Sequence, residues 1–387
     1  IAPIAKANGL DPYVTGPGGL LGDLFGAFEG IDSSLLLTTL GVVALILIVV
    51  YRSPILWMLP LFSAVIALST AGGLVYLLTK NDVIDLNGQS QGILSVLVLG
   101  AATDYALLLI SRYREELHHY EQPAQAMRAA LKGVFEPIVA SGATVIAALL
   151  VLLLSDLSGN RGLGPVGAIG IAAAVIVILT LLPALLVAFG RWVFWPRIPR
   201  NDDVNTQLTG TWAKIGSAVE KRPRKLWILT AVALSILAGF STTLNARGLS
   251  TADAFTQRPD SVVGLERLGE HFPGGSGQPT EVVIPQGLVD SVSAALLNVE
   301  GVSSVEPMRI SPAIPGQPLS EVKVVDGKVV LNATLALNPD SVEAREIIPV
   351  IREAVHAIDP NILVGGSTAV AFDTDVSANR DNKTIIP

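Results

Sequence analysis

The sequence contains no cysteine, and histidine, aromatic and charged residues are all scarce. Without thiols the chain has neither disulfide bonds nor thiolate metal ligands. Histidine occurs four times, aromatic residues make up 5% of the chain, and charged residues make up 15%. The formal net charge is −7, so the charge balance does not favour a nucleic acid as a partner.

Apolar residues, by contrast, are abundant. Half of the 387 residues are hydrophobic, and the mean hydropathy is +0.56, which is high for a soluble domain. Because a spanning helix needs about 20 mostly apolar residues, the sequence predicts a multi-pass membrane protein. The expected spans are Ser34–Tyr51, Leu56–Leu78, Gly92–Ser111, Ile138–Leu154 (with Glu136–Pro137 as its start), Gly164–Ala188 and Leu226–Leu244.

Basic residues in the loops predict the orientation of these spans. The short loops on one side contain only Lys80 and Arg161. Because basic loops stay in the cytoplasm, the richer side is expected to face inward, and both chain ends outward. The basic residues of that side are Arg52, Arg112, Arg114, Arg128, Lys132, Arg191, Arg197, Arg200, Lys214, Lys221, Arg222, Arg224 and Lys225.

Beyond Leu244 the sequence becomes polar and its hydrophobic period changes. Asp326–Gly327 between two alternating segments predicts a tight hairpin, and Asp340–Ser341 is typical of a helix start. The order strand, helix, strand, strand, helix, strand predicts a ferredoxin-like (split βαβ) domain. The expected elements are Glu281–Ile284, Gly287–Val299, Ser303–Ile310, Glu321–Val325 with Lys328–Leu337, Ser341–Ile358 and Asn361–Val364.

The predicted fold is therefore an α-helical polytopic membrane bundle of six spans with an α+β ferredoxin-like extracytoplasmic domain. Thr211–Val219 in the linker has apolar residues at helical spacing, so it is either an interfacial amphipathic helix or an ordinary connecting helix. The expected layout is the end of a first extracytoplasmic domain (1–31), a transmembrane bundle of five helices (32–190), a cytoplasmic linker (191–223), the sixth span (224–244) and a second extracytoplasmic domain (245–387).

One ionisable side chain, Asp104, lies in the middle of a predicted span. A carboxylate in hydrocarbon costs at least about 2.5–3.5 kcal/mol, so it needs a partner, a water-filled cavity or a proton. Burial favours the protonated acid, and Tyr105 can donate to the carboxylate or accept from the acid. We therefore expect a buried site that binds and releases protons. A structural acid held by hydrogen bonds is the alternative.

Neighbouring residues provide candidate support for this site. Gly100, one turn before Asp104, leaves space for a neighbouring helix. Ser141 and Thr144 are candidate hydrogen-bond partners, or alternatively small residues that pack helices. A charged cluster ends the same span, and it is either a cytoplasmic gate for protons or an interfacial anchor with salt bridges. Its members are Arg112, Arg114, Glu115 and Glu116.

No pattern in the sequence indicates an enzyme. There is no phosphate-binding Gly-x-x-x-x-Gly-Lys-Ser/Thr motif, and no nucleophile–base constellation. His118–His119 lies in a charged loop that is expected to be solvated rather than metal-binding. We therefore expect no cofactor and no metal.

A weak internal repeat indicates a duplicated protein. Val14-Thr-Gly16 precedes Asp23 by the same spacing at which Val364-Gly-Gly366 precedes Asp373. The first copy leads into a predicted span, and the chain opens with isoleucine rather than methionine, with no plausible signal peptide. We therefore expect a fragment, or a processed or trimmed product, that covers about one period.

The run from Gly100 to Glu116, GAATDYALLLISRYREE, resembles the fourth transmembrane helix of MMPL transporters, which belong to the resistance–nodulation–division superfamily of proton-driven exporters. Tyr51-Arg-Ser-Pro54, Ser141-Gly-Ala-Thr144, Leu181-Leu-Pro183-Ala-Leu-Leu and Phe272-Pro-Gly-Gly275 agree with that family. The resemblance implies twelve helices and two external porter domains, of which the first helix, most of the first domain and the last five helices are absent here.

The resemblance also implies a proton relay of crossed Asp–Tyr contacts, with Asp104 and Tyr105 on one side and a second Asp-Tyr helix in the missing half. The expected function is export of a lipid or other hydrophobic or amphiphilic cargo across the inner membrane, driven by the proton-motive force. Protons, the cargo, membrane lipids and the missing half are the expected partners. The alternatives are a non-exporting member that assists export or senses lipids, and a truncated membrane scaffold.

Overall fold

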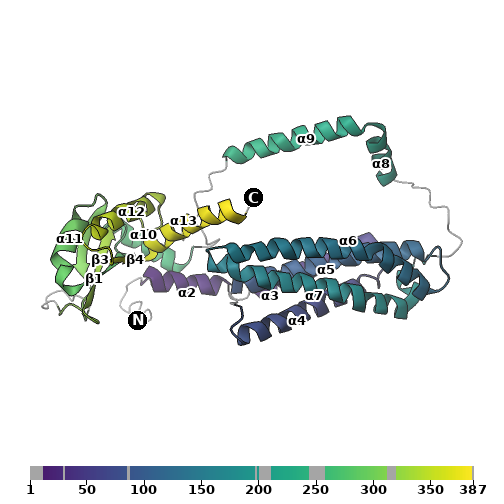
Figure 1. Cartoon of the computed structure of the whole chain (residues 1–387), viewed down its shortest axis with the longest axis horizontal. Coiled ribbons are helices and arrows are strands. Elements are labelled where there is room, and N and C mark those ends of the chain that lie inside the picture. The colour runs from purple at the N-terminus through teal and green to yellow at the C-terminus, as the bar shows by residue number, and fades with distance from the viewer. Residues whose placement is uncertain are drawn as a thin grey trace. The chain divides into compact units, whose positions relative to one another are not determined.

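The computed structural model describes residues 12–28, 31–84, 88–196, 198–199, 211–243, 258–311 and 320–385. The chain divides into two compact units. The sheet unit comprises Ile1–Ile31 and Arg247–Asn382, and the helical unit comprises Asp32–Ala246 and Lys383–Pro387. Figure 1 labels the helices and strands of both.

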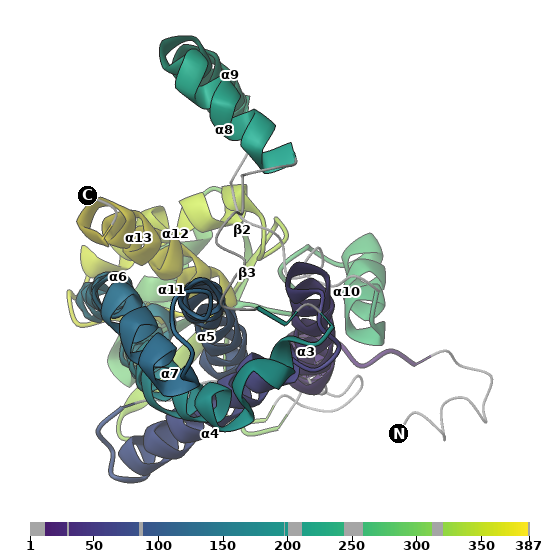
Figure 2. The ribbon, with the colours of Figure 1, turned by 90° about the vertical axis from the view of Figure 1, so that its right-hand side faces the viewer.

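The helical unit is a bundle in which α5 and α7 each contact three other helices. α7 contacts α4, α5 and α6, and α5 also contacts α4 and α6, as the nearly end-on view in Figure 2 allows the reader to follow. The bundle helices are α3 (Ile31–Tyr51), α4 (Met58–Lys80), α5 (Gly88–Glu116), α6 (Pro123–Val151) and α7 (Ser158–Phe189).

Five helices of the described chain are long and apolar enough to cross a membrane. They are α4, α5, α6, α7 and α9 (Pro223–Phe240). The first predicted span falls in α3, whose apolar stretch Leu35–Tyr51 is shorter than these five. The chain is thus a mostly helical membrane protein with a small antiparallel sheet, and the first of its six expected spans, Ser34–Tyr51, stays a prediction.

Two predicted helix boundaries are wrong. α6 begins at Pro123, which follows an extended Gln122 and occupies a first-turn position where its missing N–H is not needed. Pro137 lies inside α6. Membrane helices tolerate an internal proline when neighbouring groups satisfy the carbonyl that it leaves without a donor. α5 continues beyond the predicted end at Ser111 to Glu116, and the charged cluster forms its last turns, as expected.

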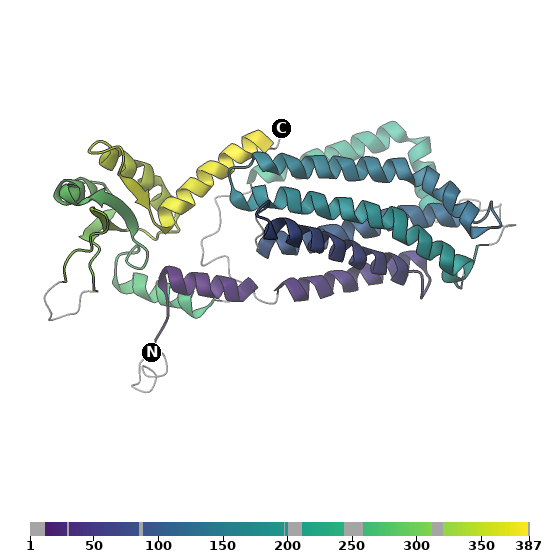
Figure 3. The same cartoon turned by 60° about the horizontal axis from the view of Figure 1, so that its bottom comes forward.

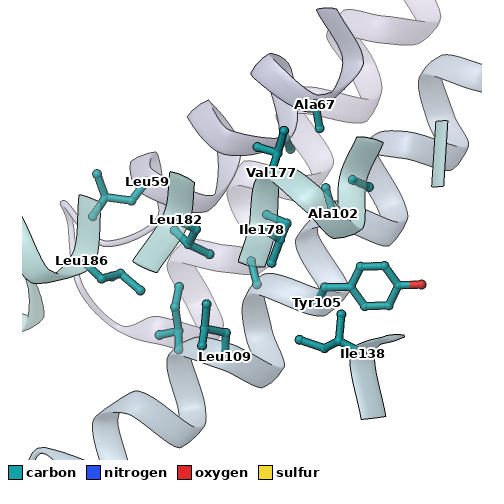
Figure 4. Close-up of a cluster of buried hydrophobic side chains, with 14 of the residues drawn as sticks. Leu59, Ala67, Ala102, Tyr105, Leu109, Ile138, Val177, Ile178, Leu182 and Leu186 are labelled. Atoms are coloured by element: carbon teal, nitrogen blue, oxygen red, sulfur yellow. The ribbon is translucent and has the colours of Figure 1, made fainter. Parts of the chain in front are cut away.

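Small residues let the bundle helices approach closely. A Cβ on Gly164 of α7 would lie 2.7 Å from the backbone oxygen of Leu149 on α6. A Cβ on Gly170 would lie 2.5 Å from Cδ1 of Leu94 on α5. Around these contacts the core consists mainly of Ala, Val, Leu and Ile side chains, several of which are shown in Figure 4.

A further helix pair follows the bundle along the chain. α8 (Thr211–Lys221) forms where the sequence predicts the linker helix, and it contacts α9. Ile215 and Val219 of α8 are about half exposed, at 47% and 49%, and α9 has no buried residue. The interfacial placement of α8 stays a prediction.

The sheet unit contains a four-stranded sheet in the order β2-β3-β1-β4, with every neighbouring pair antiparallel. α11 (Val289–Leu297) follows β1, and α12 (Val342–His356) follows β3. Apolar residues of both helices and of the strands form one core. The elements occur in the predicted order. The strands are β1 (Thr280–Pro285), β2 (Val302–Pro307), β3 (Lys328–Leu335) and β4 (Leu363–Gly365).

The predicted local signals of this unit are present. Asp326 and Gly327 both have positive φ, 51° and 72°, and the backbones of Val325 and Lys328 exchange hydrogen bonds across this two-residue turn. The Ser341 hydroxyl accepts a hydrogen bond of 3.1 Å from the amide of Ala344, which caps α12. The predicted strand Glu321–Val325 forms isolated bridges only.

The N-terminal helix α2 (Gly16–Phe28) belongs to the sheet unit and contacts α10 (Asp260–His271). The two lie side by side in Figures 1 and 3. The Thr15 hydroxyl donates to the carbonyl of Ser261 at 2.7 Å, and the Ser261 amide donates to the carboxylate of Asp23 at 3.2 Å.

Both copies of the predicted repeat begin in the same way. Gly16 and Gly366 have φ of 80° and 93° and stand at the start of α2 and α13 (Ser367–Ile385). Asp373 of α13 forms an ion pair of 2.6 Å with Arg352 of α12. At the matching position of the first copy, Asp23 accepts a hydrogen bond from the Ser261 amide of α10. The shared geometry supports the repeat.

Candidate functional site

Helix α5 has one face that the bundle does not cover. Val96, Gly100, Asp104 and Leu108 recur along it at four-residue spacing, and all four are exposed. Val96 and Leu108 are 39% and 43% exposed. The opposite face packs against α4, α6 and α7. Asp104 therefore lies midway along an uncovered and otherwise apolar stripe of a helix that is long enough to span the membrane.

The Asp104 carboxylate has no hydrogen bond or ion pair in the part of the chain that the structure describes. The expectation that Asp104 is buried is therefore wrong for this chain. The sequence shows that the residue lies in a span, but it does not show which face of that span the other helices cover.

The Tyr105 side chain lies on the face of α5 that the bundle covers. Its side chain is 3% exposed and lies beside Ile138 of α6 within the bundle (Figure 4). Gly142 of α6 makes room for it: a Cβ at Gly142 would lie 3.7 Å from Oη of Tyr105 and 2.7 Å from Cγ2 of Val175 on α7. Asp104 and Tyr105 thus place a carboxylate outside the bundle and a phenol inside it.

Sequence reasoning missed Gly142, although the Ser141–Thr144 motif contains it. Ser141 and Thr144 are both exposed, and the Thr144 hydroxyl donates to the carbonyl of Ala140 at 2.8 Å. Within the described residues neither of them bonds to Asp104. Gly100 has open space where a Cβ would project. Support of Asp104 by these residues stays a prediction.

The structure gathers the charged residues at the end of α5. Arg112 forms ion pairs with Glu115 at 2.9 Å and with Glu116 at 2.6 Å. Glu116 is only 7% exposed, and a Cβ on Gly133 of α6 would lie 3.2 Å from Nε of Arg112. Arg114 also has an interaction partner. Both ion pairs lie within the last turns of α5, and the Arg112 side chain packs beside Gly133 of α6.

Two further residues, Arg191 and Ser53, form hydrogen bonds to backbone carbonyls at the same end of the bundle. Arg191, just after α7, donates to the carbonyls of Leu117 (2.9 Å), Tyr120 (2.5 Å), Glu121 (3.2 Å) and Pro199 (2.7 Å).

Ser53, in the motif between α3 and α4, donates to the carbonyl of Val193 at 2.9 Å. Arg52 beside it adopts φ of 51° and ends α3. The sequence offered no signal for the Arg191 bonds, because they join loops that are far apart in the chain.

The described residues contain no group of three or more metal-ligating side chains. The candidate site comprises a carboxylate without a partner among the described residues, a buried phenol and ion-paired groups at the end of α5. A carboxylate in an apolar setting can gain and lose a proton.

Comparison with known proteins found a matching family model and several relatives. The model of the MMPL family matches residues 1–226. The membrane protein ActII-3 of Streptomyces coelicolor is 44% identical over 388 residues, which cover 100% of this chain and 53% of that protein. The apo-petrobactin exporter of Bacillus anthracis is 30% identical, over 98% of this chain and 53% of its own length.

A third relative, the sulfolipid-1 exporter MmpL8 of Mycobacterium tuberculosis, is 29% identical over 97% of this chain and 34% of its own length. The chain thus spans about half the length, or less, of these curated relatives.

Proposed function

The chain belongs to the MMPL family, and from this premise we propose that the complete protein exports a lipid or another hydrophobic or amphiphilic cargo, driven by the proton-motive force. Asp104 and Tyr105 form one side of its proton relay. The names of two relatives, the apo-petrobactin exporter and the sulfolipid-1 exporter, support export, and the second names a lipid as its cargo.

One observation carries the relay assignment. Asp104 stands exposed on an apolar stripe of a spanning helix and has no partner among the described residues. Against lipid a carboxylate costs about 2.5–3.5 kcal/mol or more. A charge that only stabilised this bundle would face its interior and be paired, whereas this one faces outward. Its position suits a group that meets a partner helix or a proton.

The partner is a second Asp-Tyr helix from the remainder of the protein. Gly100 has open space on the same stripe, one turn away, so a neighbouring backbone can come close to the carboxylate. Protonation of Asp104 removes the cost of burying its charge and alters how the two helices pack. Tyr105, held by Ile138 and Gly142, supplies a hydroxyl from the bundle side.

The remaining parts have assigned roles in the proposal. The ion pairs of Arg112 with Glu115 and Glu116, together with Arg114, form the cytoplasmic gate. Ser141 and Thr144 support the relay when the partner helix is present. We retain 32–190 as the transmembrane bundle, 224–244 as the sixth span and 1–31 and 245–387 as parts of two extracytoplasmic porter domains. The strand order β2-β3-β1-β4 supports a ferredoxin-like fold for the second.

Substitution of Asp104 by asparagine tests the proposal, because the amide keeps the size and hydrogen bonding but cannot ionise. Proton flux is measured with a trapped pH-sensitive dye in proteoliposomes under an imposed pH gradient, and export by mass spectrometry of lipids released from producing cells. Asp104→Asn should abolish both, while Asp104→Glu retains part. Asp82→Asn is the matched control, since Asp82 is an exposed carboxylate outside the spans.

The possible outcomes distinguish the proton relay from its two alternatives. Normal proton flux in Asp104→Asn would refute the relay. Flux that depends on Asp104 without release of lipid would favour the non-exporting alternative. A wild-type protein that inserts normally but passes neither protons nor lipid would favour the scaffold.

A further inference from the structure

A groove opens on the bundle between α4 and the beginning of α5, away from Asp104. Its volume is about 570 Å³, and its lining is mainly apolar. Along α4 it follows Leu68, Gly72 and Val75 to Lys80, and Gln91 of α5 closes its polar end. From Leu68 to Lys80 the helix rises about 18 Å at 1.5 Å per residue, which is roughly half of a ~30 Å hydrocarbon core. The groove therefore spans one leaflet.

The polar end of the groove carries a positive charge. Lys80 lines this end. Within the described residues Lys80 forms no ion pair, although Asp82 lies two residues further along the chain. By the distribution of basic loop residues, this end faces outward. An ammonium group at the outer interface, above a leaflet-deep apolar groove, complements an anionic headgroup above an acyl chain.

Thr79 provides an independent observation. Serine and threonine in spanning helices usually donate to a carbonyl of their own helix, and Ser63, Ser69 and Thr70 of α4 do so. The Thr79 hydroxyl is buried and has no hydrogen-bond partner, and Thr79 lines the groove. A buried unpaired hydroxyl costs about 1–3 kcal/mol, and a headgroup bound in the groove would satisfy it once the hydroxyl turns toward the groove.

We propose that this groove binds an anionic acyl lipid of the outer leaflet, with the chain along Leu68, Gly72 and Val75 and the headgroup at Lys80, Thr79 and Gln91. The inference names a class of amphiphile that the bundle recognises. It does not depend on the proton relay, because the groove shares no residue with it.

Photocrosslinking tests the proposal without any proton gradient or transport. The protein is reconstituted in phosphatidylcholine vesicles that contain a small fraction of phosphatidylglycerol with a diazirine near the end of its acyl chain. Phosphatidylcholine with the same diazirine is the comparison probe. The anionic probe should label the α4 peptide around Leu68–Val75 about threefold to fivefold more than the neutral probe, which is the effect expected of one partly solvated ion pair.

Matched variants separate recognition from disruption of the fold. Gly72→Phe fills the groove and should remove the labelling, whereas Gly73→Phe should not, because both glycines have open space around a Cβ but only Gly72 lines the groove. Lys80→Gln should reduce labelling by the anionic probe to the neutral level, and Lys80→Arg should retain it. Equal labelling by the two probes, or equal effects of Gly72→Phe and Gly73→Phe, would mean an annular lipid only and would overturn the proposal.

Discussion

Replacing Gly142 with alanine tests the close packing of α6 against α7 beside Tyr105. The new Cβ would lie 2.7 Å from Cγ2 of Val175. Valine is β-branched and stiff at χ1, so it cannot swing aside and α6 and α7 must separate slightly. Overpacking of this kind costs about 1–3 kcal/mol, and alanine recovers about 0.5–1 kcal/mol relative to glycine in a helix. The expected net destabilisation is about 0–2.5 kcal/mol relative to the wild type, and about 1–3 kcal/mol relative to a glycine-to-alanine change without overpacking.

The assay is thermal unfolding of the purified protein, followed by the loss of the monodisperse species after heating. Gly73→Ala in α4 is the control, because nothing lies within 4 Å of its Cβ, and it should leave the melting temperature unchanged or raise it. A Gly142→Ala protein that melts at or above the temperature of the control would refute the reasoning, since it would show that the helices are not so closely packed beneath Tyr105.

Two predictions concern the sheet unit. Gly327→Ala places a side chain at φ of 72° and should destabilise the unit by about 1–2 kcal/mol, seen as faster amide hydrogen exchange in β1 and β3; Gly287→Ala, in open space, should not. The hydrogen bond from Arg352 holds the pKa of Asp373 below its ordinary value. The resulting stability is present above the ordinary pKa of about 3.9 and is lost as the pH falls through the lowered native value. Arg352→Met should therefore reduce the loss of stability on acidification, and an unchanged acid profile would contradict this.

Much of the architecture could be predicted because it depends on local patterns. Apolar runs of spanning length located the bundle helices, Asp326–Gly327 located the hairpin, and Ser341 located the start of α12. Each of these signals lies within a few residues of the feature it specifies. The start of α6 was wrong because Pro123 and Pro137 are both compatible with a first helical turn, and only the observed helix distinguishes them.

The candidate site could be predicted only in part. Its position on α5 followed from a charge within an apolar run, but the face that it occupies depends on where α4, α6 and α7 pack. Gly142 was overlooked because the hydroxyls beside it offered more evident chemistry, whereas the glycine acts through the space it leaves. The contacts of Arg191 with the loop after α5 depend on tertiary structure alone.

The Arg191 contacts have a mechanical consequence. One guanidinium holds the carbonyls of Leu117, Tyr120 and Glu121, directly after α5, while its own backbone directly continues α7. A loop held at three points is a stiff link and not a hinge. If α5 slides or tilts when Asp104 gains or loses a proton, the C-terminal end of α7 must move with it. The two helices would then move as one rigid body.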